Sequence, residues 1–239
     1  DSLNVNQNTL LTTLYCGVNL LTSLDVSDNF LLEYLGLGSN IPAIMATIKN
    51  QITSLNLSNN PALIQLNCRG NLLTSLNLSN NIALTWLEVG DNKLTSLNVS
   101  NNTALISLQC NINQITSLDV SDNNALTYLS CSYNSLTNLD LRNGNNYNFL
   151  NPWNSANAGF AGNNNPYLYC IDVDDVAWSD ANWIGSIDST MSFSINCPSS
   201  GCTDSLACNY DSTAIIDDSS CGYPTSDSVA CDILGALPA

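Results

Sequence analysis

Apolar residues recur over the first 144 residues of the chain in a phrase of constant shape. Leucine or a similar residue stands at the first, fourth and sixth positions, and asparagine stands at the ninth. Two forms of the phrase alternate at steps of 10 and 11 residues, which gives a full period of 21 residues. One coil therefore contains a first phrase, such as Leu63, Leu66, Cys68 and Asn71, and a second phrase, such as Leu73, Leu76, Leu78 and Asn81. A fixed period of this length predicts a solenoid of stacked coils.

Each phrase predicts one short strand. In Leu87-Glu88-Val89 the two apolar side chains point one way and Glu88 points the other, which is the period of a strand. One such strand buries too little surface to be stable, so successive coils are expected to stack ~4.8 Å apart. The asparagine that ends each phrase can bond backbone groups of neighbouring loops and form an internal ladder. We therefore predict a mainly β solenoid of about six coils with parallel β-ladders, ~30 Å long.

One coil is longer than the others, because the ten residues IPAIMATIKN (41–50) lie between Asn40 and Gln51 without disturbing the register. The apolar residues Ile41, Ile44, Met45 and Ile48 make this insertion compatible with a lid, an interface or a packed bulge. The chain also begins in mid-coil, since SLNVNQNTLL (2–11) aligns with SLNVSNNTAL (96–105). Because natural proteins cover open sheet edges, we expect a mature or cropped piece of a longer secreted protein.

The phrases LTSLDVSDN, LTSLNVSNN and LISLQCNIN resemble leucine-rich repeats, in particular the nested 21-residue type LxxLxLxxNxLxxLDLxxNxx. The resemblance covers residues 3 to about 144, so residues 1–144 are interpreted as one repeat domain. It departs from the family pattern at the insertion and at Gly144, which replaces the last turn asparagine. The resemblance implies a right-handed leucine-rich-repeat solenoid.

The segment 145–198 is interpreted as a C-terminal cap, which opens with a loop-like stretch rich in Asn and Gly. NPYLYCIDVDDVAWSDANW and SFSINC resemble the cap of repeat domains in secreted surface proteins of the Bacteroidetes, which use type IX secretion. The apolar residues expected to cover the last coil are Tyr169, Ile171, Val173, Trp178 and Trp183. The run Asp172, Asp174 and Asp175 fits a solvated or helix-capping cluster better than a cation site, which is the alternative.

Residues 199–239 are interpreted as a separate small module rich in Cys and Asp. The stretch GCTDSLACNYDSTAIIDDSSCG resembles a short CTDxxAxNYDxxAxxDDGSC unit near the C-termini of those secreted proteins, with Ser219 in place of Gly. A unit this short needs disulfides or a metal to be stable. Hard oxygen ligands suit calcium, and the candidates are Asp204, Asn209, Asp211, Asp217 and Asp218. A merely solvated acidic surface is the alternative, because the strict DxDxDG loop is missing.

The ten cysteines fall into two sets. Cys16, Cys68, Cys110 and Cys131 occupy a core position of the repeat and are predicted to be free buried thiols. Cys110 and Cys131 fall on adjacent coils, but their parallel Cβ vectors are poor geometry for a disulfide. The other six cysteines lie outside the repeats, and their order together with the resemblance favours the pairs Cys170–Cys197, Cys202–Cys221 and Cys208–Cys231. Disulfides indicate an extracellular or cell-surface location.

Charge excludes several classes of function. Only 10% of the residues are charged, the net charge is −16, and the chain has four basic residues and no histidine. A nucleic-acid partner needs a basic surface, and an anionic membrane surface is an equally poor partner. Histidine, the commonest general base and zinc ligand, is missing, and the spacing of the cysteines does not suit a zinc cluster. Apolar runs are too short for a membrane span.

The solvent side of the two phrases differs. The second phrase repeats Ser-Leu-Asp or Ser-Leu-Asn in nearly every coil, which is typical of structure; an ice-binding face is disfavoured by the carboxylates. The first phrase varies, and its exposed aromatic and polar residues suit recognition, although aromatic residues favour strands in any case. The candidate ligand-binding residues on this variable face are Tyr15, Tyr34, Gln65, Arg69, Trp86, Glu88, Gln109 and Tyr128.

The sequence predicts a protein without catalytic residues. No nucleophile elbow, phosphate-binding loop or dinucleotide fingerprint is present, and Glu33 and Glu88 are too far apart to act as a carboxylate pair. We expect a non-catalytic extracellular recognition or adhesion module that binds a surface glycan or protein, with no cofactor other than the calcium considered above. The alternative is a structural segment of a long surface protein or filament, in which the solenoid self-assembles or forms a homo-oligomer.

Overall fold

The computed structural model describes residues 2–38, 49–149, 159–198, 200–214, 216–217 and 220–223. The chain divides into two compact units, residues 1–195 and 196–239. Most of the predicted insertion 41–50 lies outside the described residues, so its role stays a prediction. No helix within the described ranges is long and apolar enough to cross a membrane.

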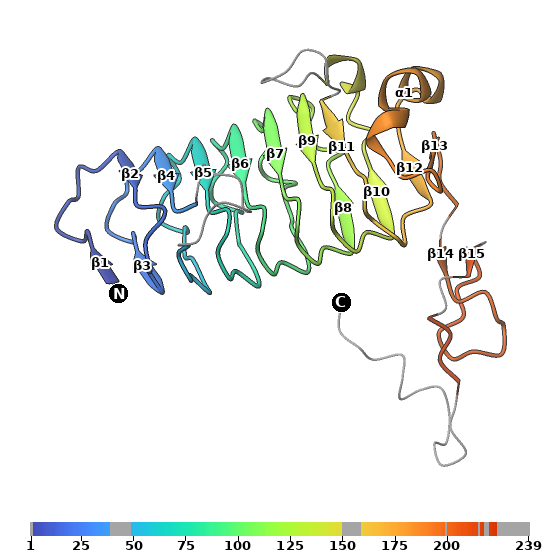
Figure 1. The fold of residues 1–239 in the computed structure, drawn as a ribbon, viewed down its shortest axis with the longest axis horizontal. Coiled ribbons are helices and arrows are strands. Elements are labelled where there is room, and N and C mark those ends of the chain that lie inside the picture. Colours follow the sequence, from blue (N-terminus) through green and yellow to red (C-terminus); the bar gives the residue numbers. More distant parts are fainter. Residues whose placement is uncertain are drawn as a thin grey trace. The chain divides into compact units, whose positions relative to one another are not determined.

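The first phrases build a seven-stranded parallel sheet along the solenoid (Figure 1). Its strands, in spatial order, are β2 (Thr13–Tyr15), β4 (Tyr34–Gly36), β5 (Gln65–Asn67), β6 (Trp86–Glu88), β7 (Ser107–Gln109), β9 (Tyr128–Ser130) and β11 (Phe160–Ala161). Leu66 pairs with Leu87, and Leu87 pairs with Leu108. The repeat period therefore becomes an in-register ladder, with these leucines fully buried.

The second phrases form the other side of the solenoid (Figure 1). β1 (Ser2–Asn4) pairs with β3 (Ser23–Asp25), and a four-stranded parallel sheet contains β8 (Ser117–Asp119), β10 (Asn138–Asp140), β12 (Cys170–Asp172) and β13 (Ser192–Ser194). The coils between β3 and β8 that contain Leu55, Leu76 and Leu97 follow the same path without regular strand pairing. The predicted mainly β parallel solenoid is confirmed, with about eight turns.

Asparagine side chains form the predicted internal ladder. In the first phrase, Asn71 Nδ2 donates to the Cys68 carbonyl at 3.0 Å, and Asn71 Oδ1 accepts from the Ile52 amide at 3.2 Å. In the second phrase, Asn81 Nδ2 donates to the carbonyl of Asn60 at 2.9 Å. These amides satisfy backbone groups at the turns and fix the spacing of successive coils.

Two ladder positions differ from the sequence assignment. The repeat phrase Leu32, Leu35 and Leu37 predicts Asn40 as the ladder residue of the long coil. Asn50 occupies this position instead, because its Nδ2 donates to the carbonyls of Cys16 and Leu37. The extra residues therefore precede the ladder residue instead of following it. At the other end, Gly144 does not end the ladder, since the neighbouring Asn143 donates to the carbonyl of Asn123 at 3.1 Å.

Within the first unit, the segment that follows the repeats extends both rows of strands. β11 pairs with β9, β12 pairs with β10, and β13 pairs with β12. This continuation explains why the solenoid has more turns than the repeats alone predict. The predicted boundary at 144/145 falls inside the first compact unit, and the division into three domains stays a prediction.

A short helical segment and aromatic residues close this end. The 3-10 helix η1 (Asn146–Asn148) precedes β11, and α1 (Val176–Trp183) is followed by the 3-10 helix η2 (Ile184–Ser186). Asp175 caps α1 by accepting from the Trp178 amide at 3.0 Å, which confirms the helix-capping interpretation of this carboxylate. Ile171, Val173 and Trp183 are fully buried, as predicted. Tyr169 does not cover the core, because half of its surface is exposed.

The second unit contains β14 (Ser200–Gly201) paired in parallel with β15 (Ile216–Asp217). The predicted Cys202–Cys221 disulfide is confirmed. Cys170, Cys197 and Cys208 are also disulfide-bonded, but the pairs Cys170–Cys197 and Cys208–Cys231 stay predictions, and Cys231 lies outside the described residues. The four cysteines of the repeats are free and buried, as predicted.

Candidate functional site

The outer face of the seven-stranded sheet carries the candidate binding residues in two parallel rows. The central leucine is buried in strands β4 to β9 of this sheet, as in β6, where half-buried Trp86 and Glu88 flank buried Leu87. One row contains Tyr34, Gln65, Trp86, Ser107 and Tyr128, which pair in register. The other row contains Tyr15, Gly36, Asn67, Glu88, Gln109 and Ser130. The structure thus brings seven of the eight candidates onto β-strands of one face, with Arg69 just beyond β5.

Glu88 is the centre of a polar cluster on this face. Its Oε2 accepts from Asn67 Nδ2 at 3.0 Å, and its Oε1 lies 3.3 Å from Arg69 Nη1. The Arg69 amide in turn donates to Asn67 Oδ1 at 3.0 Å. Both charged side chains are mostly buried, so their geometry is set by the surrounding sheet. Asn67 was missed as a site residue, although it stands in the same variable row as Glu88.

A hollow of about 170 Å³ opens beside this cluster. We call it the Trp86 hollow; it is lined by Tyr15, Leu35, Gln65, Leu66, Asn67, Trp86 and Glu88. Four of the predicted binding residues therefore meet around one depression. Tyr34, Arg69, Gln109 and Tyr128 lie on or beside the same face but do not line it.

Gly36 determines how Tyr15 enters the hollow. A Cβ atom at Gly36 would lie only 2.3 Å from Tyr15 Cδ1, so the ring lies directly against the backbone of β4. Any other residue at position 36 would push the ring away. Despite this contact, 69% of Tyr15 is exposed, which leaves most of the ring available to a ligand.

Tyr128 stands next to the cluster and keeps its proton at neutral pH. Burial raises the pKa of this phenol, the negative charge of Glu88 adds to the increase, and the positive charge of Arg69 opposes it. Because the phenol stays protonated, its hydroxyl can donate a hydrogen bond. The side chain is half-buried on the candidate face.

The candidate calcium ligands of the second unit take part in local turns. Asp204 accepts from the Leu206 amide and the Tyr223 hydroxyl, and the pKa of Asp204 is lowered chiefly by the Tyr223 bond. Asp211 accepts from the amide and hydroxyl of Thr213, which likewise lower its pKa. Asn209 closes the loop by donating to the Ser220 carbonyl and accepting from the Gly222 amide.

These contacts provide a structural role for the acidic residues of the module. Asp217 belongs to β15, and Asp218 lies outside the described residues. Within the ranges that the structure describes, no three His, Cys, Asp or Glu side chains are grouped to hold a metal ion. Calcium binding stays a prediction.

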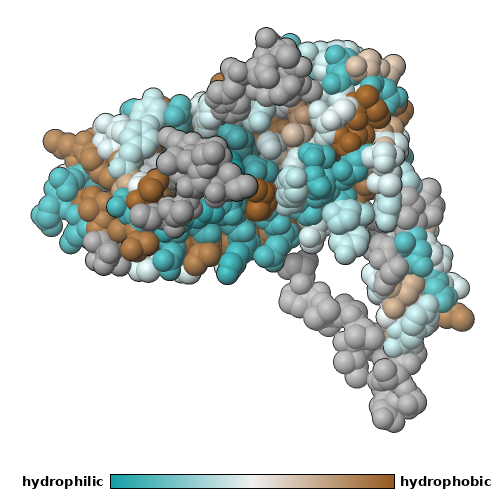
Figure 2. All heavy atoms as spheres, viewed as in Figure 1, coloured by the Kyte–Doolittle hydropathy of each residue, from teal (hydrophilic) through white to brown (hydrophobic). Residues whose placement is uncertain are grey.

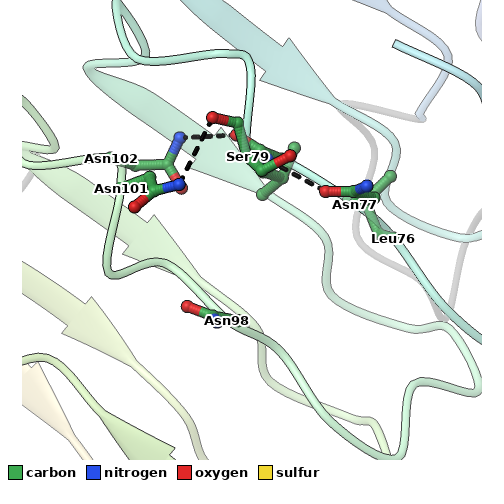
Figure 3. Close-up of a pocket in the computed structure, with 7 residues that line it drawn as sticks. Leu76, Asn77, Ser79, Asn98, Asn101 and Asn102 are labelled. Carbon is green, nitrogen blue, oxygen red and sulfur yellow. Dashed lines mark hydrogen bonds between the residues drawn. The ribbon is translucent and has the colours of Figure 1, made fainter. Parts of the chain in front are cut away.

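The second-phrase side carries small polar notches that recur from coil to coil. The notch in Figure 3 has a volume of about 70 Å³ and is lined by Leu76, Asn77, Leu78, Ser79, Asn98, Asn101 and Asn102. Asn102 and Asn101 donate across it to the carbonyls of Leu78 and Ser79. A similar notch of about 50 Å³ lies one coil earlier, so these notches follow from the repeat itself.

Comparison with known proteins gives structural matches only. No protein-family model matches the chain, and no curated protein matches it. A leucine-rich-repeat protein of Leptospira interrogans is similar over 80% of this chain and 50% of its own, with 20% sequence identity and a TM-score of 0.53. This similarity shows that the two proteins share a fold.

Two proteins of Listeria monocytogenes are also similar. The functional domain of InlJ, described as including a cysteine ladder, is 31% identical over 76% of this chain and 40% of its own, with a TM-score of 0.46. An internalin is 20% identical over 82% of this chain and 52% of its own, with a TM-score of 0.47. The chain spans about half the length of the solved structures that it matches.

Proposed function

We propose, from the leucine-rich-repeat fold of this chain, that it is a non-catalytic recognition or adhesion module that binds a surface glycan or protein. The observation that supports this function is the Trp86 hollow, in which aromatic and polar side chains from the three strands β2, β5 and β6 meet on a rigid face. Exposed aromatic residues supply large contact areas with little loss of conformational freedom. Repeat solenoids commonly use such an extended sheet face to contact a partner.

The location that fits this function is extracellular or at the cell surface. Disulfides such as Cys202–Cys221 persist in oxidising environments outside the cytosol. Export by type IX secretion in a member of the Bacteroidetes is part of the proposal and rests on the sequence resemblance of residues 145–222 alone.

The chemistry of the hollow favours binding over catalysis. Glu88 is the acidic residue among its lining residues, and Arg69 pairs with that carboxylate. A general acid or base of a hydrolase usually works with a second group placed on the other side of the substrate. The lining residues of the hollow do not include such a second acid or base.

A binding screen on cells and immobilised glycans tests the recognition face. The double variant Trp86→Ala/Tyr128→Ala is expected to lose at least about tenfold in affinity, equivalent to roughly 1.4 kcal/mol. The matched control Ser96→Ala/Asn98→Ala changes two exposed residues of the second-phrase side and is expected to bind as the unchanged protein does. If the Trp86→Ala/Tyr128→Ala variant binds as tightly as the unchanged protein, the binding site does not lie on the variable face.

Repeating the same screen with and without calcium shows whether ligand binding depends on the metal. A separate titration tests whether the acidic module itself binds calcium. If the module holds calcium, titration of the metal alone gives a heat of binding that is lost in Asp204→Asn/Asp211→Asn. Absence of heat with the unchanged protein would leave the solvated acidic surface as the explanation.

A second candidate function is self-assembly, which is favoured by the apolar surface of the first coils. Figure 2 shows hydrophobic residues at the end of the solenoid that contains β1 and β2. Exposed fractions there are 81% for Leu10, 50% for Leu20 and 53% for Phe30.

Light scattering after size-exclusion chromatography tests this second candidate. Self-assembly predicts a mass that rises with concentration and falls to that of a monomer in Leu20→Ser/Phe30→Ser. A monomer at every concentration in the unchanged protein would exclude assembly through this end.

A further inference from the structure

We propose that the Trp86 hollow is a subsite for one uncharged pyranose ring of a neutral glycan. This inference rests on the proposed function, because it names the ligand class of the same face. The five residues assigned to the ring are Tyr15 and Trp86 as aromatic walls and Gln65, Asn67 and Glu88 as polar partners.

The size of the hollow limits what it can contain. Its volume of about 170 Å³ is below the ~300 Å³ at which pockets for drug-sized ligands begin. One six-membered ring, or one side chain of a partner, is therefore the appropriate unit. A chain of such rings can continue along the sheet face while a single ring occupies the hollow.

The walls of the hollow match the two kinds of surface on a pyranose. Its axial C–H groups form an apolar patch that packs against aromatic rings, and Tyr15 and Trp86 supply such rings from β2 and β6. Tyr15 is positioned in advance, because its ring lies against Gly36 while 69% of the residue stays exposed. Binding therefore requires little ordering of this side chain.

The polar residues suit the hydroxyl groups of the ring. Gln65 is exposed and carries both donors and acceptors on one amide. Asn67 and Glu88 hold each other at 3.0 Å and are braced by Arg69, so the carboxylate oxygens have a fixed direction. A carboxylate offers about four acceptor positions, which leaves capacity for sugar hydroxyls beside the bonds to Asn67 and Arg69.

Charge favours a neutral ligand. The chain has a net charge of −16, and the lining residues of the hollow include Glu88 but neither Lys nor Arg, which opposes sulfated or carboxylated sugars. A basic side chain of a protein partner would compete with Arg69 for Glu88, from which Arg69 is separated by 3.3 Å. An uncharged ring avoids both conflicts.

Calorimetric titration of the full chain with neutral tetrasaccharides of glucose, galactose, mannose and N-acetylglucosamine tests the proposal. At least one is expected to bind, with an affinity that is nearly insensitive to salt because the ligand carries no charge. Trp86→Ala is expected to weaken that binding by at least about tenfold and Gln65→Ala by a few fold. The matched control Tyr167→Ala removes an exposed tyrosine that is not among the candidate binding residues and is expected to leave the affinity within about twofold.

The outcomes separate this proposal from the proposed function. Thermal unfolding of each variant establishes that it is folded, and Trp86→Phe, which keeps an aromatic wall, is expected to recover part of the affinity. Tighter binding of a sulfated or sialylated tetrasaccharide would overturn the neutral-ring assignment. If no sugar binds but cell-surface binding is lost in Trp86→Ala, the hollow accepts a protein side chain and only this proposal fails. If neither binding is seen, both fail.

Discussion

A left-handed residue precedes the ladder asparagine in most first-phrase turns. Positive φ angles occur at Val18, Gly70, Asp91, Ile112, Tyr133 and Asn164. Glycine adopts this conformation without cost, whereas an L-residue with a branched Cβ is strained by ~1–2 kcal/mol. The turn therefore imposes a backbone conformation that is unfavourable for Val18, Ile112 and Tyr133, and coil packing maintains it.

Replacement of Ile112 by glycine is expected to stabilise the protein. Ile112 has a φ of 58° and is 38% exposed, so relief of strain outweighs the modest loss of burial and the entropy cost of glycine. The free energy of unfolding should rise by roughly 0.5–1 kcal/mol in chemical denaturation. Ile106 is a suitable control, because it is an exposed isoleucine without positive φ, and Ile106→Gly should destabilise. Equal effects of the two substitutions would contradict the strain at position 112.

Gly38 supports both the fold and the Trp86 hollow. A Cβ atom at this position would lie 2.1 Å from Asn67 Oδ1 and 2.8 Å from the Arg69 amide. Asn67 lines the hollow and bonds Glu88, so crowding at Gly38 displaces a residue of the candidate site.

Gly38→Ala is expected to lower the free energy of unfolding by roughly 1–3 kcal/mol and to weaken ligand binding. Gly185→Ala is the control, because the added methyl group meets nothing within 4 Å. Denaturation and binding assays on the two variants measure the difference. Normal stability of Gly38→Ala would show that the neighbouring coil shifts without cost.

At the scale of the coil, the asparagine ladder is the main polar element. Asn102 is almost fully buried and donates to the carbonyl of Leu78 at 3.2 Å (Figure 3). It also donates to the carbonyl of Asn81 at 2.9 Å. Its neighbour Asn101 is exposed and donates to the Ser79 carbonyl at 3.4 Å. Adjacent residues of the same type therefore differ in burial and in the backbone groups that depend on them.

Asn102→Ala is expected to cost roughly 1–3 kcal/mol, because the carbonyls of Leu78 and Asn81 each lose one of two donors and keep only a backbone amide. Asn101→Ala should change the free energy of unfolding by less than about 0.5 kcal/mol, as exposed substitutions generally do. Urea denaturation of both variants, followed by circular dichroism, gives the comparison. A similar loss in the two proteins would mean that burial of the ladder amide contributes little.

At the scale of the whole molecule, the two compact units depend on different interactions. The solenoid contains one continuous apolar core of stacked leucines, whereas the second unit is short and contains the Cys202–Cys221 disulfide. This disulfide joins residues 19 positions apart, and closing a loop of that length stabilises a folded unit by ~3 kcal/mol.

Cys202→Ser/Cys221→Ser is therefore expected to unfold the second unit and to leave the repeats intact. Hydrogen exchange should become fast over residues 200–217 and stay slow at the buried strands β5 to β9. Cys68→Val is the control, because Val89 occupies the equivalent core position of the next coil. Faster exchange throughout the repeats of the double variant would show that the disulfide stabilises both units.

The 21-residue repeat is sufficient to predict the solenoid, its two rows of strands and the buried thiols. With a period of 21 residues, only one register of neighbouring coils buries the apolar side of every LxL phrase. Equivalent residues of neighbouring coils, such as Leu66 and Leu87, must therefore align. The repeat also placed Tyr15, Gln65, Trp86 and Glu88 on the outer face, because residues beside a buried leucine alternate to solvent. The free state of Cys110 and Cys131 followed from the same core position.

Which of these residues meet depends on contacts between segments that are distant in the sequence. Tyr15 reaches the hollow because Gly36 lies under its ring, and Asn67 joins the site through Glu88, 21 residues away. The ladder position of the long coil passed to Asn50 through bonds to a residue 34 positions earlier. Phe160 extends the first-phrase sheet without a repeat phrase of its own. Periodicity predicts whether a side chain points into the core or to solvent. It does not predict toward which neighbouring strand an exposed side chain leans, because that depends on the residues packed beside it.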